Sequence, residues 1–174
     1  MTNQVRLRWL GGLALLVACV GCDQATKRLA TQTLRNTPAR SYLADTVRLE
    51  YALNPGGFLS LGANLPPTVR RGVFIAFNAG LLLGFAALLG LRRDLSAAWF
   101  LAVLGLLAGG IGNLIDRVSH DGLVIDFINL GVGPVRTGIF NVADVAITGG
   151  GLALLALSWR RSGQPTSPIS APQP

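Results

Sequence analysis

The sequence predicts an all-α membrane protein with four transmembrane helices. Of its 174 residues, 51% are hydrophobic and only 13% are charged, about half the charged share of an average soluble domain. Mainly apolar stretches of about 20 residues, the length that crosses a bilayer core, occur four times along the chain. A soluble fold would leave much of this apolar surface in water, so the composition favours a membrane protein.

Each predicted span is bounded by polar or charged residues. The first ends in the polar run Asp23 to Lys27, and the second ends at the pair Arg92 and Arg93, a tight polar hairpin before the third. Each span is long enough to cross the bilayer as a helix. The four spans run over Leu7–Leu29, Val73–Leu91, Leu95–Ile115 and Ile139–Trp159.

Residues outside the spans predict little regular structure. Val47 to Leu53 alternates weakly between apolar and polar residues, which predicts a short strand in a small sheet on the outer surface. The end of the chain, residues 162–174, is rich in Pro, Ser and Gln, which predicts a disordered tail. We therefore expect one four-helix domain over residues 1–161, with outer loops near 34–70 and 118–138.

Basic residues set the predicted orientation. The side with the two termini and the tight loop carries six arginines, whereas the other side carries nine basic residues spread over two longer loops. Density near helix ends in short loops is the better guide, so both termini are predicted in the cytoplasm. Of the eight acidic residues only Asp94 then lies on the inner side. Chemistry that needs carboxylates would sit at the outer boundary. The six arginines are Arg6, Arg8, Arg92, Arg93, Arg160 and Arg161.

Other classes of site are disfavoured. The net charge of +7 is spread along the chain without a basic run, so no nucleic-acid partner is expected. The single histidine, His120, and the two cysteines, Cys19 and Cys22, offer no metal site, and we expect no cofactor. The cysteines are too close within one helical stretch to bridge each other, and we interpret them as small apolar residues.

The first span could also be a removable lipoprotein signal acylated at Cys22. The position three before Cys22 would then normally be Leu, but it is Cys19, and Val20 is not small. Three further spans follow as well. A permanent helix is therefore the favoured interpretation.

Ionisable residues at membrane depth are costly and indicate function by default. Asp144 lies a few residues into the fourth span, with Asn141 three residues earlier on the same helical face. A carboxylate favoured by the helix dipole is the plain alternative. Asn113, Asp116 and Arg117 share a face at the end of the third span. Arg117 either neutralises nearby carboxylates at a site or forms a simple ion pair or helix cap.

Three further features lie at the outer ends of the spans. Asp126 is flanked by apolar residues on both sides, which is unusual for a solvated loop, although a turn-forming Asp remains the alternative. Asp23 and Lys27 form an i, i+4 pair in the favoured order, either solvated or supporting a site. Asn54 and Gly56 lie in a turn whose Asn could bond an extended peptide, or which is a plain loop.

These residues favour carboxylate chemistry. The chain has no G-x-S-x-G turn and no His–Glu metal motif. Two carboxyls held close share one proton, so that one activates water while the other protonates the carbonyl oxygen. Asp126 and Asp144, 18 residues apart, are the candidate pair. A small transporter or channel subunit is the main alternative, disfavoured by the lack of paired inverted repeats. A non-catalytic assembly factor is the second.

Five short motifs, in order along nearly the whole chain, resemble lipoprotein signal peptidase, also called signal peptidase II. Each motif is weak alone, but five in order with four spans are specific. The motifs are Asp23-Gln24-x-x-Lys27, Asn54-x-Gly56, Gly112-Asn113-x-x-Asp116-Arg117, Val124-x-Asp126-Phe127 and Phe140-Asn141-x-Ala143-Asp144.

The resemblance implies an aspartic endopeptidase of the bacterial plasma (inner) membrane, built from four transmembrane helices, a small extracytoplasmic β-sheet and a short amphipathic surface helix. It implies removal of the signal peptide from a prolipoprotein before its diacylglyceryl-modified cysteine, contact with membrane lipid, and inhibition by globomycin. Asp126 and Asp144 would be the catalytic pair. Asn54, Gly56, Asn113, Arg117 and Asn141 would line the site, and Asp23, Lys27 and Asp116 would support it.

Two departures from the family pattern bear on the substrate. Only Gly57 separates Gly56 from Phe58, so the Asn54–Phe58 loop is one residue shorter than usual. Residues 130–138 contain no aromatic side chain, although this stretch is usually aromatic-rich. We expect altered handling of the substrate lipid or of inhibitors, with the catalytic pair retained.

Overall fold

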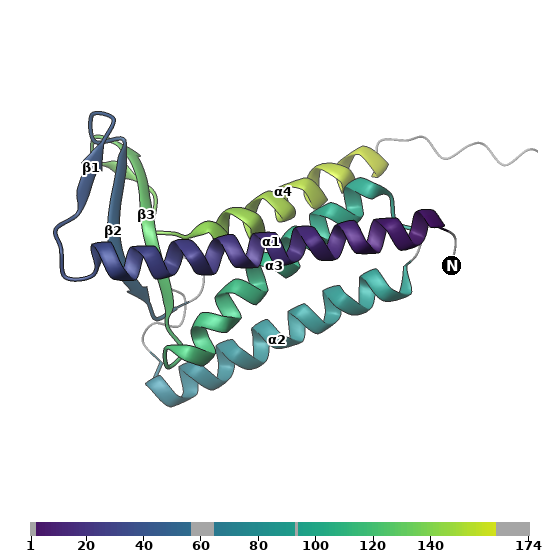
Figure 1. Ribbon diagram of the computed structural model, residues 1–174, viewed down its shortest axis with the longest axis horizontal. Helices are drawn as coiled ribbons and strands as arrows, with labels where there is room; N and C mark the ends of the chain where they lie inside the picture. Colours follow the sequence, from purple (N-terminus) through teal and green to yellow (C-terminus); the bar gives the residue numbers. More distant parts are fainter. Residues whose placement is uncertain (1–2, 57–64, 93, 163–174) are drawn as a thin grey trace, which may run out of the picture.

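The computed structural model describes residues 3–56, 65–92 and 94–162, and it places four helices beside a small sheet (Figure 1). All four helices are long and apolar enough to cross a membrane, which confirms the predicted multi-pass fold. The helices are α1 (Asn3–Leu34), α2 (Pro67–Leu91), α3 (Ala97–Ser119) and α4 (Val142–Ser162). The strands are β1 (Arg40–Tyr42), β2 (Val47–Asn54), β3 (Val124–Val132) and β4 (Val135–Arg136).

The helix bounds differ from the predicted spans mainly at their outer ends. Helix α1 continues to Leu34, beyond the predicted end at Leu29. Helix α4 begins at Val142, not at the predicted Ile139. The difference arises because Phe140 forms an isolated β-bridge with Ile128 and so belongs to the sheet. Periodicity alone does not reveal such a tertiary pairing.

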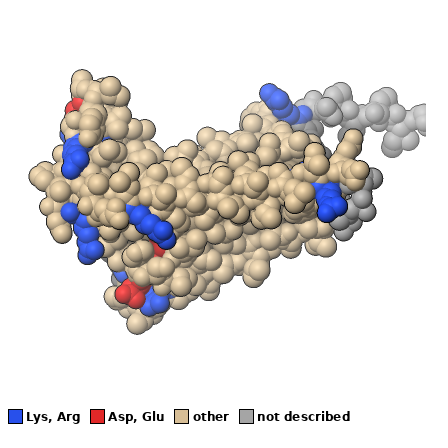
Figure 2. Space-filling view, viewed as in Figure 1, with Lys and Arg blue, Asp and Glu red and all other residues tan. Residues whose placement is uncertain are grey.

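Helix α3 is the centre of the bundle. Its residues Val103 and Leu107 are buried, whereas Leu13 of α1 and Leu83 of α2 are 60% and 72% exposed. A Cβ at Gly109 of α3 would clash with the backbone of α4, so this glycine permits the close approach of the two helices. Figure 2 shows that charged side chains gather at the two ends of the molecule and leave an uncharged belt between them. This belt is the lipid-facing surface of a membrane protein.

The sheet lies across one end of the helices (Figure 1). Its order is β1-β2-β3-β4, with every neighbouring pair antiparallel. The predicted strand at Val47–Leu53 is confirmed as β2, which pairs with β3. The pairing shifts register between Leu49 and Ala52, and beyond the shift Ala52 lies opposite Asp126. The sheet thereby places Asp126 at the end of the helical bundle.

Three expectations concern segments outside the described residues. Gly57 and Phe58 of the shortened loop lie there, as does the tail over residues 163–174. Within residues 3–56, 65–92 and 94–162 the structure contains no short surface helix. These three expectations stay predictions.

Candidate active site

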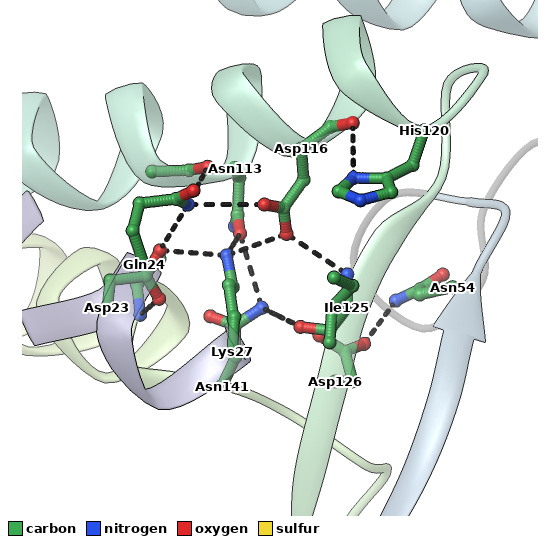
Figure 3. Close-up of polar contacts among 12 residues, drawn as sticks. Asp23, Gln24, Lys27, Asn54, Asn113, Asp116, His120, Ile125, Asp126 and Asn141 are labelled. Carbon is green, nitrogen blue, oxygen red and sulfur yellow. Dashed lines mark hydrogen bonds and ion pairs between the residues drawn. The ribbon is translucent and has the colours of Figure 1, made fainter. Parts of the chain in front are cut away.

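A buried ion cluster joins α1 to α3 (Figure 3). The Lys27 ammonium lies 2.9 Å from an oxygen of Asp23 and 2.9 Å from an oxygen of Asp116, and all three side chains are at most 2% exposed. The predicted i, i+4 pair therefore forms, and it is buried rather than solvated. Buried charges that lose a partner destabilise a protein strongly, so the three groups are interdependent.

The cluster also holds the loops and helices that carry the remaining acids. Asp23 Oδ1 accepts a hydrogen bond from the backbone N–H of Ala143 at the start of α4, at 2.9 Å. Asp116 Oδ2 accepts one from the backbone N–H of Ile125 in β3, at 3.0 Å. Each cluster carboxylate thus positions the segment next to one candidate catalytic acid, Asp144 or Asp126.

Asp126 enters the site from β3 and is 1% exposed. Its Oδ2 accepts from Asn54 Nδ2 at 3.0 Å, and its Oδ1 accepts from Asn141 Nδ2 at 2.6 Å. Burial, and then the nearby negative charge of Asp144, raise the pKa of Asp126 to about 6. The carboxyl of Asp126 therefore holds a proton at pH values where an exposed Asp has lost it.

Asp144 enters from the first turn of α4, where it forms a capping box with Asn141. Asn141 Oδ1 accepts from the backbone N–H of Asp144 at 2.9 Å, and Asp144 Oδ2 accepts from the backbone N–H of Asn141 at 3.1 Å. Asp144 Oδ1 also accepts from Asn113 Nδ2 at 2.9 Å. Asp144 therefore lies at the positive end of the α4 dipole, which is the alternative that the sequence left open. It also contacts α3 through Asn113.

Asn141 connects the two candidate acids directly. Its side-chain amide donates to Asp126 and its backbone N–H donates to Asp144. Asn141 is fully buried, so this bridge is shielded from solvent. Asn113 adds a second connection, because its Oδ1 accepts from both Lys27 Nζ and Asn141 Nδ2 while its amide donates to Asp144. The tertiary structure thus gathers residues from α1, α3, α4 and two strands around one pair of carboxyls.

Arg117 does not form the plain ion pair that was one of the alternatives considered from the sequence. Among the described residues it forms no salt bridge; its guanidinium donates to the Gly56 carbonyl at 2.8 Å and lies over the Phe74 ring. Asp116, its sequence neighbour, pairs with Lys27 instead. Arg117 does interact electrostatically with Asp144, Asp126 and Asp116, so it offsets their negative charge from a distance. Its hydrogen bond fixes the turn in which Asn54 Oδ1 accepts from the Gly56 N–H at 2.9 Å.

Two participants were not singled out from the sequence. Gln24 Nε2 donates to Asp23 Oδ2, to the Gly112 carbonyl and to Asp116 Oδ1, at 3.1 to 3.2 Å. Its place directly after Asp23, at the end of an apolar span, was the available signal. His120, for which the sequence indicated no metal site, lies 3.2 Å through Nδ1 from the Asp116 carbonyl oxygen, and only the fold reveals that contact.

Four apolar helices, with the buried Asp126 and the partly buried Asp144 at one end, define a multi-pass membrane protein with a polar site at the end of its bundle. The sequence profile described as signal peptidase (SPase) II matches residues 15–160. The chain belongs to the signal peptidase II family. The family match disfavours the transporter, channel and assembly-factor alternatives.

Similar proteins agree with this assignment. A lipoprotein signal peptidase of Desulforapulum autotrophicum is 33% identical over 129 residues, covering 74% of this chain and 79% of the relative. One from Leifsonia xyli subsp. xyli is 36% identical over 142 residues, covering 78% of this chain and 61% of the relative. A solved bacterial membrane enzyme superposes with a TM-score of 0.78 at 21% identity, covering 92% of this chain and 94% of that structure. At that identity the superposition concerns the fold alone.

Proposed function

We propose that this protein is an aspartic endopeptidase that removes signal peptides from diacylglyceryl-modified prolipoproteins, before the lipidated cysteine, with Asp126 and Asp144 as its catalytic pair. The observation that carries the proposal is the bridge through Asn141, which contacts both carboxyl groups. Family membership supports the prolipoprotein substrate. Two carboxyls that interact closely favour a state with a single shared proton.

The proposed mechanism assigns one proton to the pair. The pKa of Asp126, raised to about 6 by burial and by the nearby charge of Asp144, favours Asp126 as the protonated partner of the pair. The ionised carboxylate takes a proton from water while the oxygen of that water attacks the peptide carbonyl. The protonated carboxyl donates to the carbonyl oxygen. In the second half of the reaction the roles reverse, the leaving amine receives a proton, and the peptide C–N bond breaks.

The surrounding amides suit this chemistry. Asn54 donates to Asp126 and Asn113 donates to Asp144, so each acid keeps a fixed orientation. We assign Asn54, Gly56, Asn113, Arg117 and Asn141 to the lining of the site. Asp23, Lys27 and Asp116 support it from within the bundle. Preorganised groups lower the barrier because they need no rearrangement during reaction.

We further propose that the protein resides in the bacterial inner membrane with both termini in the cytoplasm. The density of arginine in the short inner segments supports this orientation. Asp126 in β3 and Asp144 in the first turn of α4 then lie at the outer boundary of this membrane, at the end of the bundle where Figure 1 shows the sheet. We expect contact with membrane lipid and inhibition by a globomycin-type cyclic peptide, modified by the shortened Asn54–Phe58 loop and the non-aromatic 130–138 stretch.

Cleavage of purified prolipoprotein tests the proposal. Asp126→Asn and Asp144→Asn should each abolish cleavage of a diacylglyceryl-modified substrate. Asn keeps only one of the two acceptor oxygens that each acid uses, so the Tm of each variant is measured alongside to check that it is folded. Asp121→Asn is the matched control, because the Asp121 side chain is 88% exposed. The unlipidated substrate should be cleaved far more slowly. Native-rate cleavage by either site variant would show that the pair is wrongly assigned.

A further inference from the structure

The far end of the sheet has one apolar and one polar face. In register across β1, β2 and β3, the row Tyr42, Val47 and Leu130 is apolar, and the adjacent row Ser41, Arg48 and Asn129 is polar. Adjacent rows in a pleated sheet point to opposite faces. Val132 and Val135 pair across the β3–β4 turn and extend the apolar face.

The apolar face is exposed at the tip of the sheet. Val132 is 76% exposed and Val135 is 77% exposed, while Tyr42 is 47% and Leu130 is 38% exposed. We call these four residues the tip face. On the opposite face Asn129 is buried because the Arg136 Nε donates to its Oδ1 at 2.5 Å. At this far end of the sheet the exposed aliphatic side chains of the paired rows therefore lie on one side.

The tip face is directed toward the helical bundle. Along β3, Ile128, Leu130 and Val132 alternate with their neighbours and so share a face. Ile128 packs against the cluster that contains Ala30 and Leu34 of α1, which shows that this face is turned toward the helices. Figure 1 shows that the strands run across the end of the bundle and that the β1–β2 end of the sheet projects past α4. There the face overhangs the lipid that surrounds α4.

The turns that carry the tip face are held in a defined shape. In the β1–β2 turn Leu43, Ala44 and Asp45 have φ of 51°, 51° and 65°, values that L-residues adopt at a cost. Asp45 accepts from Ser41 and Arg48 and so fixes this turn. The β3–β4 turn is attached to it, because the Gly131 N–H donates to the Thr46 carbonyl at 2.9 Å. Leu43, 76% exposed, is thus displayed at a rigid tip.

We propose that the tip face rests in the headgroup–acyl boundary of the outer leaflet, with the bilayer as its partner. The membrane already surrounds the four helices, and the tip face extends that apolar contact sideways at the outer end of the bundle. Apolar side chains bound at this boundary enter the headgroup region by about 5–10 Å. The polar row on the opposite face stays toward water.

Contact between the tip face and the bilayer would fix the depth of Asp126 relative to the membrane surface. Asp126 and Val132 lie on the same strand, which pairs with β2 from Val124 to Leu130. Anchoring one end of β3 in the interface restricts tilting of the sheet relative to the bundle. Asp126 is thereby kept at the same depth as a substrate peptide bond that lies at the membrane surface.

Site-directed fluorescence tests the contact without relying on catalysis. A single cysteine at position 132 or 135, in a Cys19→Ala, Cys22→Ala background, is labelled with an environment-sensitive dye. The protein is placed in nanodiscs of phosphatidylethanolamine and phosphatidylglycerol. Labels at 132 and 135 should be quenched by lipids with a nitroxide near the headgroup and shielded from aqueous iodide. A label at Ser41, on the polar face, should show the reverse pattern.

Three results would overturn the proposal. Iodide quenching at 132 and 135 equal to that at Ser41 would place the tip face in water. Shielding that arises only after prolipoprotein is added would make the substrate its partner.

Hydroxyl-radical footprinting of the unmodified chain covers the case in which the labelled variants misfold. Leu43, Val132 and Val135 should be oxidised in amphipol and protected in nanodiscs, and equal oxidation in both would refute the contact. A failure of the proposed peptidase activity would leave all these readouts unchanged.

Discussion

Replacing Asp23 by Asn should lower stability far more than it slows chemistry. The Asp23 carboxylate is buried, and it accepts from Lys27 Nζ at 2.9 Å through Oδ2 and from the Ala143 N–H at 2.9 Å through Oδ1. An amide keeps one acceptor oxygen and turns the other into an NH2 group. That NH2 then faces either the ammonium or the N–H, both of which are donors.

The magnitude follows from these contacts. Losing a hydrogen bond to a charged group costs about 1.5–3 kcal/mol, and a buried donor without an acceptor costs about 1–3 kcal/mol. The Lys27 contact to Asp116 persists, so part of the charge remains compensated. We therefore expect a loss of about 3 kcal/mol, which lowers the Tm of a chain of this size by about 10 °C. Among the described residues Asp23 makes no hydrogen bond to Asp126 or Asp144 itself. An Asn whose remaining oxygen accepts from the Ala143 N–H keeps the start of α4 in place, so the chemical step keeps its geometry.

Thermal unfolding in detergent, combined with single-turnover cleavage well below the Tm, separates the two effects. Asp23→Asn should melt about 10 °C lower and cleave within about threefold of the native rate, since the loss falls on folding and not on the transition state. Asp121→Asn removes an exposed carboxylate paired with Arg71 and should leave both quantities unchanged. An unchanged Tm with a large loss of single-turnover rate would refute the reasoning, because Asp23 would then act on the chemistry itself.

Two further predictions concern the carboxyl pair. With the pKa of Asp126 raised to about 6 from an ordinary 3.8, the stabilising contribution of its proton is fully present below pH 3.8 and lost as pH rises to about 6. The unfolding free energy of the native protein relative to Asp126→Asn should therefore fall by about 3 kcal/mol over that range. The kcat/KM should decline above a pH of about 6. A difference in unfolding free energy that does not change with pH would contradict the raised pKa. Asn141→Ala removes one donor to Asp126 and the cap of α4, so kcat should fall by about 100-fold while stability falls by about 1 kcal/mol. Cleavage assays and melting of that variant check both, and native kcat with reduced stability would limit Asn141 to a structural role.

The spans could be predicted because hydrocarbon imposes a simple rule on a sequence. A helix satisfies its own backbone hydrogen bonds, so any apolar run of sufficient length can cross a bilayer without help from its neighbours. The ends of the spans were less predictable. The sequence places Phe140 within the fourth apolar run. Its backbone pairs with Ile128 of the sheet instead, and α4 begins only at Val142.

The candidate acids were visible in the sequence because a carboxyl beside apolar residues is costly without a purpose. Their partners were not visible from spacing. Arg117 follows Asp116 directly, yet the ammonium that neutralises Asp116 comes from Lys27, almost ninety positions earlier in the chain. Helix geometry turns adjacent residues to different sides, so a neighbour in sequence is often not a neighbour in space.

The sequence alone determined the membrane class, the four spans, the family and the identity of the acidic residues, because length, hydropathy and motif order are properties of the chain itself. Only the tertiary structure decided that Asn141 contacts both Asp126 and Asp144, and that Lys27 is buried between Asp23 and Asp116. It also placed the apolar tip face on the side of the sheet whose residues Leu49 and Ile128 pack against α1. These contacts join segments remote in sequence, and their geometry exists only after the helices pack and the strands find their register.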